Sequence, residues 1–274
     1  MTKITASEVN NLRKISGAGI MDCKNALVEA NGDTEAAIEI LRKKGQKVAA
    51  KRADRESSEG AAIAKVSSDN STGVIVSLNC ETDFVAKNES FVALANELAE
   101  LAISHETLDD FLNCEIDSMS VSEKLIQQTG VIGEKLVIGN FEKVSAGYVG
   151  KYIHAGNKIA TLVGFSSSVE GIEEASKNVA MQAAAMNPIA LDEDGVDQKT
   201  IEKEIEIAKD QLRQEGKPEA MLDNIAKGKL KRFFKDNTLV NQDYIKDNKQ
   251  SVSSYVKSIN SDLTITDFKR VSLS

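Results

Sequence analysis

The order of the predicted elements repeats once along the chain, and this repeat constrains the fold more than any other feature. Two strands around a polar turn are predicted within residues 61–80, and an amphipathic helix follows at about 90–103. The same order returns in a strand pair within residues 147–165 and a helix at about 172–185. Strands that are joined by a short turn pair antiparallel. The repeat therefore predicts an α+β fold whose core has two related halves with antiparallel sheets.

The first 45 residues predict three short helices. Thr5 and Glu8 have the spacing of a capping box, in which each side chain binds a backbone N–H of the other residue. A second helix is expected at about 21–30, and a third from Asp33 to Gly45, because glycine often ends a helix. Three helices of this length bury few side chains, so a docking module is expected rather than a catalytic unit. In the first helix, the apolar residues Val9, Leu12 and Ile15 follow at helical spacing.

A charged segment of small residues at 48–60 follows these helices and predicts a linker. We place a boundary near residue 55. Together with the repeat, this predicts three units: residues 1–54, the core half at 55–145 and the core half at 146–274.

Residues from about 190 to 237 carry apolar side chains at the intervals of a coiled-coil seam. Pro218 follows Gly216 and ends the first helix, since proline lacks the N–H that a helix interior requires. We expect an antiparallel helical hairpin, held by one apolar seam and otherwise polar. The predicted seam residues are Ile201, Ile205, Ala208, Leu212, Met221, Leu222, Ile225 and Leu230.

Charge and residue usage argue against several classes of function. The net charge is −8, and basic residues are dense only at 42–55 and 227–235, so nucleic acid is not the first expected ligand. The three cysteines lie far apart and there are two histidines, so neither a disulfide framework nor a metal site is indicated. The first ten residues lack the pattern of a leader, and no apolar stretch approaches the ~20 residues of a membrane span. We expect a cytoplasmic protein without cofactor or metal.

The sequence motifs also indicate no catalytic residues. There is no phosphate-binding loop, and the D-x-x-G spacing at 192–195 is weak without one. His154 lies in a predicted turn, remote from any cysteine, so an exposed turn residue or a partner contact is favoured over a catalytic base. Cys80 ends an apolar strand and is expected to be buried. We therefore expect a protein that is not an enzyme and binds no nucleotide directly.

One connection carries an aromatic residue in an unusual place. Phe84 lies between the strand ending at Cys80 and the helix beginning near Ser90, with Asp83 beside it. Apolar loop residues usually pack on the core, so Phe84 could cover the helix. Alternatively it projects as an apolar plug, because binding residues often lie on loops and aromatic anchors dominate interfaces. The residues alone leave both interpretations open.

Two long motifs resemble those of the elongation factor Ts family. Residues 82–88 (Thr-Asp-Phe-Val-Ala-Lys-Asn), preceded by Asn-Cys-Glu at 79–81, resemble the family's signature. Leu12-Arg13, the run Gly-Ala-Gly-Ile-Met-Asp-Cys-Lys-Asn-Ala-Leu at 17–27 and the segment 29–33 resemble its opening module. The resemblance extends over nearly the whole chain.

The C-terminal half both continues the resemblance and departs from it. Tyr152-Ile153-His154 and Gly216-Lys217-Pro218 follow in the family's order. Gln242-Asp243-Tyr244 stands where members often have Gln-Pro-Phe, and the sequence ends soon after residues 269–271, where others continue. The partner contacts implied for this half are therefore the least supported.

The resemblance implies a ubiquitin-associated-like three-helix module, a two-part core and an inserted coiled-coil hairpin. It also implies guanine-nucleotide exchange on the GTPase elongation factor Tu, in which Asp83 and Phe84 displace a helix beside the magnesium–nucleotide site. The residues that would contact the partner are Thr82, Asp83, Phe84 and Val85, together with Arg13, Ile20 and Met21 in the first module and His154 in the second core half.

Two other classes of function remain as alternatives. A nucleic-acid- or ribosome-associated adaptor without exchange activity would use the basic residues at 42–55, against the net charge of −8. A cysteine- or histidine-based enzyme would need a paired nucleophile and base, which the sequence does not indicate.

Overall fold

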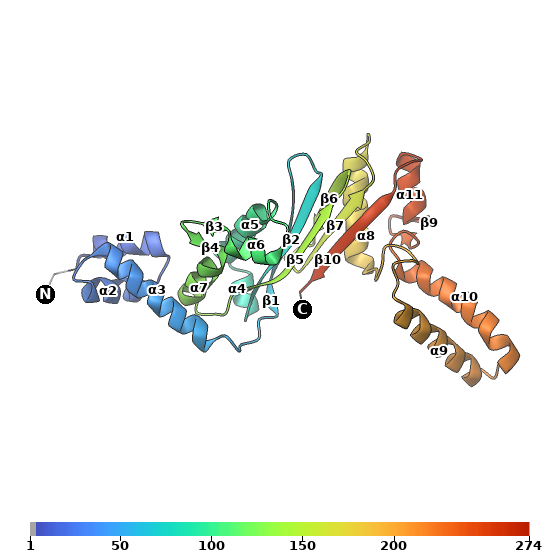
Figure 1. The fold of residues 1–274 in the computed structure, drawn as a ribbon, viewed down its shortest axis with the longest axis horizontal. Coiled ribbons are helices and arrows are strands. Elements are labelled where there is room, and N and C mark those ends of the chain that lie inside the picture. Colours follow the sequence, from blue (N-terminus) through green and yellow to red (C-terminus); the bar gives the residue numbers. More distant parts are fainter. Residues whose placement is uncertain (1–3, 274) are drawn as a thin grey trace.

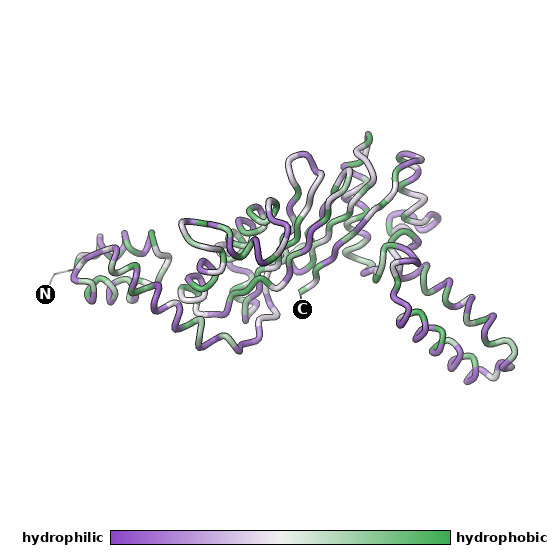
Figure 2. The backbone as a smooth tube through the Cα atoms, viewed as in Figure 1, coloured by the Kyte–Doolittle hydropathy of each residue, from purple (hydrophilic) through white to green (hydrophobic). Residues whose placement is uncertain are grey.

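The computed structural model describes residues 4–273 and shows an elongated molecule with two sheets near its centre (Figure 1). A three-helix module lies at one end of the long axis, and a helical hairpin lies at the other. Hydrophobic stretches concentrate in the central strands, whereas hydrophilic residues are frequent along the outer helices (Figure 2). The predicted α+β class is confirmed.

The first core half forms a three-stranded antiparallel sheet in the order β1-β2-β5. Helix α5 packs on this sheet through its apolar face, which buries Phe91, Leu94 and Leu98. The elements of this half are β1 (Glu59–Val66), β2 (Thr72–Cys80), α4 (Asp83–Ala86), α5 (Glu89–Ala102), α6 (Leu108–Asn113), β3 (Glu115–Ile116), β4 (Met119–Ser120), α7 (Val121–Ile132) and β5 (Val137–Ser145).

The second core half repeats this arrangement with the order β6-β7-β10. In both halves a hairpin comes first, a helix follows its second strand, and a later strand pairs antiparallel with that second strand. The repeat predicted from the pattern is thus present in the topology. The elements are β6 (Tyr148–Ile153), β7 (Ile159–Phe165), α8 (Ile172–Met186), α9 (Gln198–Gln214), α10 (Glu219–Asn237), β8 (Asp243–Tyr244), β9 (Asp247–Ser251), α11 (Val252–Ile259) and β10 (Ile265–Ser272).

The two halves share an apolar cluster, to which strands of both sheets contribute buried residues such as Ile75 and Leu162. Gly73 leaves room for this contact, because a Cβ there would lie 2.8 Å from side-chain methyl groups of Leu162 and Val149. Backbone bonds join the halves as well: the N–H of Ala62 donates to the carbonyl of residue 157 at 2.7 Å. The core is therefore held together across the repeat.

The N-terminal module has the three predicted helices: α1 (Ala6–Ser16), α2 (Ile20–Glu29) and α3 (Thr34–Lys51). The Thr5–Glu8 capping box is formed. Leu12 and Leu27 are buried in the module's core, whereas Ile15 is 57% exposed although it shares the helical spacing. Ile15 lies in the last turn of α1, just before the chain turns at Gly17 with a left-handed φ of 69°.

Helix α3 continues past Gly45, so the end predicted at this glycine is wrong. Gly45 lies where α3 crosses α7, and a Cβ on Gly130 of α7 would lie only 2.4 Å from the Gly45 Cα. Two residues without side chains let the helix backbones come close together. The glycine thus reflects a helix crossing, and the linker expected at 48–60 shortens to the residues between Lys51 and Glu59.

Helices α9 and α10 form the predicted hairpin, with Ala208, Leu212 and Leu222 buried in its seam. Met221 is 51% exposed and does not belong to the seam. Its neighbour Leu222 takes the inward position, and successive helical residues point about 100° apart. At the base of the hairpin, backbone bonds link residues 189–191 to residues 237–240.

Candidate functional site

The segment predicted as a connection after Cys80 forms a one-turn helix, α4. Thr82 is its N-cap, and the Thr82 Oγ1 accepts a hydrogen bond from the N–H of Val85 at 3.4 Å. Asp83 lies in the first turn, where a carboxylate interacts favourably with the positive end of a helix. Capping and charge explain why these residues are helical.

Phe84 projects from this helix and is 84% exposed, more than any other large apolar side chain in residues 4–273. Its neighbour Val85 points the other way and packs against the core of the first half, and Ala86 is buried. The interpretation of Phe84 as a cover for the core is therefore wrong. The Phe84 ring is exposed to solvent, and its helix is anchored to the core by Val85 and Ala86. Such a side chain is suited to enter an apolar pocket of another molecule.

Asp83, the neighbour of Phe84, forms an ion pair within α4 and its C-cap. The Lys87 Nζ lies 2.6 Å from Asp83 Oδ2, one helical turn away. This hydrogen bond lowers the pKa of the Asp83 carboxyl and raises the pKa of Lys87, and the charge of Lys158 lowers the Asp83 pKa further. Asp83 is thus ionised at neutral pH, and the bond from Lys87 fixes the position of its Oδ2.

Glu134 supports α4 from a distant part of the sequence. Its carboxylate accepts hydrogen bonds from the N–H of Glu81 at 3.1 Å, from the N–H of Thr82 at 3.0 Å and from Thr82 Oγ1 at 2.6 Å. Sequence reasoning did not select Glu134. It lies between α7 and β5 and follows no motif, so only the folded chain shows its role.

His154 is exposed in the turn between β6 and β7, as predicted. Its Nδ1 lies 3.1 Å from the Tyr152 hydroxyl. The same turn contains Lys158, which pairs with Glu59 at the start of β1 and whose charge acts on Asp83. The structure therefore places the His154 turn and α4 near the same end of the two sheets.

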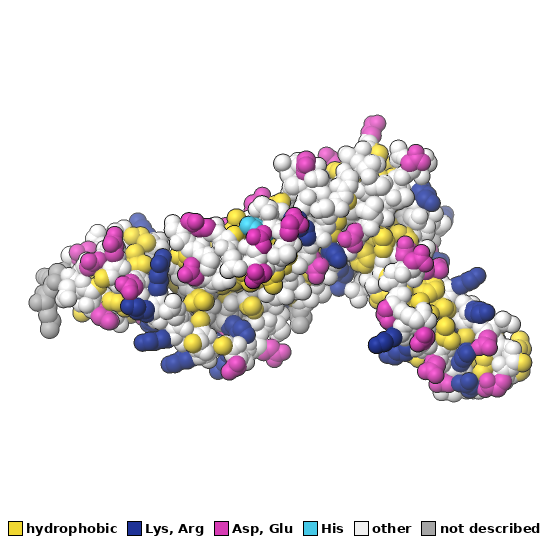
Figure 3. Space-filling model, viewed as in Figure 1, with side chains coloured by type: hydrophobic (Ala, Val, Ile, Leu, Met, Phe, Trp, Pro, Cys, Tyr) yellow, Lys and Arg dark blue, Asp and Glu magenta, His cyan; other side chains and the backbone are white. Residues whose placement is uncertain are grey.

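The three residues selected in the N-terminal module are exposed, but they lie apart from α4. Arg13 is on α1, and Ile20 and Met21 begin α2 with 52% and 62% of their surfaces exposed. Val28 on α2 is also more than half exposed, although sequence reasoning did not select it. On the face shown in Figure 3, apolar side chains gather over this module and over the helical hairpin.

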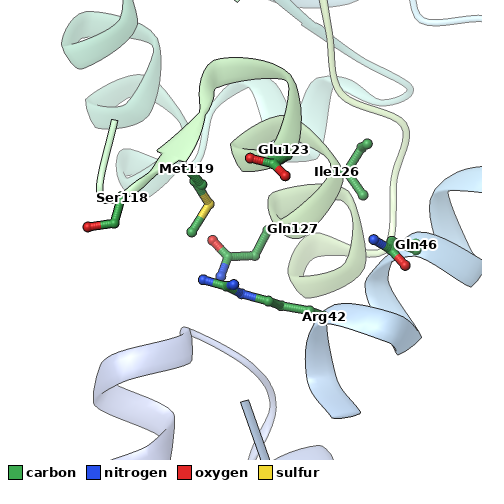
Figure 4. A pocket seen from close by; sticks show the side chains of 7 residues that line it. All are labelled: Arg42, Gln46, Ser118, Met119, Glu123, Ile126 and Gln127. Atoms are coloured by element: carbon green, nitrogen blue, oxygen red, sulfur yellow. The ribbon is translucent and has the colours of Figure 1, made fainter. Parts of the chain in front are cut away.

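A small pocket of about 130 Å³ opens between α3 and α7 (Figure 4). Arg42 from α3 reaches toward Gln127 of α7 across it. The Glu123 carboxylate is engaged in the capping box of α7 with Ser120. The lining residues, which also include Gln46, Ser118, Met119 and Ile126, offer no nucleophile paired with a base.

The described residues also show little reactive chemistry elsewhere. Cys80 is buried, and burial together with the charge of Glu134 raises the pKa of its thiol to about 12. Within residues 4–273, no three His, Cys, Asp or Glu side chains gather as they would around a metal ion. In the same range, no helix has both the length and the apolar character that crossing a bilayer demands.

Comparison with known proteins adds independent information. A family model described as Elongation factor TS matches residues 81–274. Proteins named Elongation factor Ts from Christiangramia forsetii and Flavobacterium psychrophilum are 67% and 65% identical over 273 residues, covering 100% of this chain and of each relative. The protein of that name from Amoebophilus asiaticus is 49% identical over 271 residues, with 98% of both chains covered.

Proposed function

The chain belongs to the elongation factor Ts family and is therefore a translation elongation factor; within this role we propose that it accelerates the release of GDP from the GTPase elongation factor Tu. The partner carries out the nucleotide chemistry, and this chain acts on it as an exchange factor in the cytoplasm.

The observation that carries the proposal is the exposed side chain of Phe84 on a capped, ion-paired helix. In the proposed mechanism, Phe84 inserts between elements of the partner's nucleotide domain and Asp83 offers its carboxylate beside it. Mg²⁺ requires near-ideal octahedral geometry, so a small displacement of a helix beside the ion weakens its hold on the nucleotide. GDP then leaves without any covalent step.

The energies involved are sufficient for a large effect. Fully burying a phenylalanine side chain contributes about 1.5–3 kcal/mol. Each tenfold change in an equilibrium constant corresponds to about 1.4 kcal/mol. Insertion of Phe84 alone could therefore weaken GDP binding by roughly tenfold to a hundredfold.

Other exposed residues would add affinity without acting on the nucleotide site. We assign Arg13, Ile20 and Met21 to contacts with the partner's nucleotide domain, since this module has a half-exposed apolar surface. His154 would face the partner's other domains from the β6–β7 turn. Thr82 would support α4 as its N-cap, and Val85 would support it by packing against the core of the first half.

We also propose that the chain is not an enzyme and has no cofactor. The exposed residues of the proposed site are an aromatic ring, a carboxylate and an ammonium group, which together suit binding and not bond formation. The buried Cys80 thiol, with its raised pKa, is a poor nucleophile.

The test is the release of fluorescent GDP from purified elongation factor Tu, chased with unlabelled GDP in the presence or absence of this chain. Release that is accelerated by orders of magnitude supports the proposal. Unchanged release, with circular dichroism showing that the chain is folded, contradicts it.

A second candidate function has one observation in its favour. Lys and Arg side chains gather along α3 on the face shown in Figure 3. An adaptor for RNA or the ribosome would bind through this row, and its affinity would fall steeply with salt because phosphate contacts release counterions. A mobility-shift titration with RNA at two salt concentrations distinguishes this function from exchange.

A further inference from the structure

Two segments that are far apart in the sequence exchange hydrogen bonds directly behind α4. The carboxylate of Glu134 accepts from the N–H groups of Glu81 and Thr82, at 3.1 and 3.0 Å. In return, the carboxylate of Glu81 accepts from the N–H of Lys135 at 2.7 Å. We call these four residues, Glu81, Thr82, Glu134 and Lys135, the carboxylate clasp.

The clasp determines the orientation of α4 through Thr82. The Thr82 hydroxyl donates to Glu134 at 2.6 Å, and the same oxygen accepts the N–H of Val85 as the N-cap bond. A single helical turn is not stable by itself, because nucleating a helix costs more than one turn of bonds returns. The direction in which Phe84 projects therefore depends on what holds Thr82. Charge-assisted bonds to a carboxylate are stronger than bonds between neutral groups.

The clasp also holds the end of the N-terminal module. The Arg52 Nη1 at the C-cap of α3 lies 2.8 and 2.9 Å from the two Glu81 oxygens, and both side chains are partly buried. The Lys135 Nζ donates to the backbone carbonyls of Ala53 and Arg55, at 2.7 and 3.0 Å. The linker after α3 is thus fixed to the same residues that orient α4.

Two carboxylates in one place repel each other unless positive groups compensate them. Here the Arg52 guanidinium pairs with Glu81, and the charge of Arg55 acts on the same carboxylate. Burial raises the pKa of Glu81, but the N–H of Lys135 and the Arg52 guanidinium outweigh burial and lower it overall. Glu81 therefore keeps its charge at neutral pH, as the ion pair with Arg52 requires.

From this geometry we infer that Glu134 is a positioning residue for nucleotide exchange: it holds α4 so that Phe84 points into the partner, and Glu81–Arg52 fixes α4 relative to the N-terminal module. This inference rests on the proposed exchange function. Glu134 itself touches no nucleotide; it acts through Thr82 and Phe84.

A double-mutant cycle tests the inference. The release of fluorescent GDP from elongation factor Tu is measured over a range of concentrations of the wild-type chain, Glu134→Ala, Phe84→Ala and the double variant. We expect Glu134→Ala to lower the maximal release rate about tenfold. The half-saturating concentration should change less, because the other contacts with the partner remain. The double variant should be as slow as Phe84→Ala alone, within about twofold, since Glu134 acts through Phe84.

Two further variants separate positioning from general stability. Glu134→Gln keeps one oxygen acceptor and should recover part of the lost rate. Thr82→Val removes the hydroxyl that links Glu134 to the N-cap, leaves the carboxylate in place, and should reproduce the loss even if Glu134→Ala folds poorly. Glu123→Ala is the matched control: this glutamate caps α7 through Ser120, at the end of α7 opposite to Glu134, and its variant should keep the wild-type rate within about twofold.

The outcomes separate the inference from the function on which it rests. A wild-type chain that does not accelerate release contradicts the proposed exchange function. If the wild-type chain accelerates release and both Glu134→Ala and Thr82→Val are equally fast, the positioning role is overturned. The exchange function then still stands. Losses that multiply in the double variant also overturn it, because they show that Glu134 acts independently of Phe84.

Discussion

Phe84 and Phe91 are seven positions apart and have opposite surroundings. Phe84 is 84% exposed on α4, whereas Phe91 is 1% exposed on the buried face of α5. Phe84→Ala should therefore change the free energy of unfolding by less than about 0.5 kcal/mol, as is usual at exposed positions. Phe91→Ala should lower it by about 3–5 kcal/mol, through lost burial and an unfilled cavity. Chemical denaturation of both variants measures the difference. Similar losses in the free energy of unfolding would show that Phe84 packs in the core.

The ion pair next to Phe84 predicts how exchange depends on pH. The Asp83 pKa is lowered from 3.8 by the hydrogen bond from Lys87, and the Lys87 pKa is raised from 10.5 by the bond to Asp83. The pair is lost only as pH falls through the lowered Asp83 pKa or rises through the raised Lys87 pKa. The ratio of the exchange rates of wild type and Asp83→Asn should thus be constant between about pH 6 and about pH 9. If this ratio of exchange rates changed with pH within that range, the result would contradict the ion-pair geometry.

Among single residues, the sequence indicates the exposed groups of the site but not the residues that hold these groups in position. Asp83 and Phe84 lie in a motif that can be read along the chain. Glu134 lies 52 residues from Thr82 and has no pattern around it, so its hydrogen bonds exist only after the sheet and α7 have formed. Ile15 and Val28 fit the helical pattern of apolar residues, yet both remain exposed in this small module, which has too little core to cover them.

Among the elements, the crossing of α3 and α7 decides how the N-terminal module joins the core. A Cβ on Gly130 would lie 2.4 Å from the Gly45 Cα, so a backbone must move to accept it. A Cβ on Gly45 would have its nearest neighbour at 3.6 Å, the ordinary contact distance. Gly130→Ala should thus destabilise the protein by about 1–3 kcal/mol through overpacking.

Gly45→Ala is the matched variant on the facing helix. It should be neutral or stabilising by up to about 1 kcal/mol, because alanine favours helix over glycine. Thermal unfolding of both variants by circular dichroism compares them. Equal destabilisation by the two substitutions would contradict the asymmetric contact between these glycines.

The same crossing shows where element prediction succeeds and fails. Periodicity located the paired strands β1, β2, β6 and β7 and the helical hairpin α9–α10, because each has several residues in one repeating pattern. The end of α3 was misplaced, since glycine marks both helix ends and close helix contacts, and the sequence does not distinguish them. Helix α4 was not predicted, because a single turn has no periodicity and owes its form to Thr82 and Glu134. The predicted unit boundaries remain predictions.

For the whole molecule, the arrangement suits a partner with several contact regions. The N-terminal module and the helical hairpin lie at opposite ends of the long axis, with the sheets and α4 between them (Figure 1). Separate contacts would bind the partner, while α4 alone would act on its nucleotide site. Binding and exchange should therefore be affected by different substitutions.

Thermodynamic reciprocity gives a prediction at this scale. If the chain weakens GDP binding to elongation factor Tu by some factor, GDP must weaken binding of the chain by the same factor. Titration of the chain with nucleotide-free and with GDP-bound partner should give affinities that differ by this factor, which a separate GDP titration measures. Equal affinities for the two forms would show that the chain has no differential contacts with which to displace GDP.

The most direct test of the central claim compares wild type with Phe84→Ala in the release of fluorescent GDP from elongation factor Tu, at a saturating concentration of each chain. The wild type should accelerate release strongly. Phe84→Ala, with an unchanged unfolding transition, should lose roughly tenfold to a hundredfold of that acceleration. If a folded Phe84→Ala chain accelerated GDP release as much as the wild type does, Phe84 would not be the residue that drives exchange.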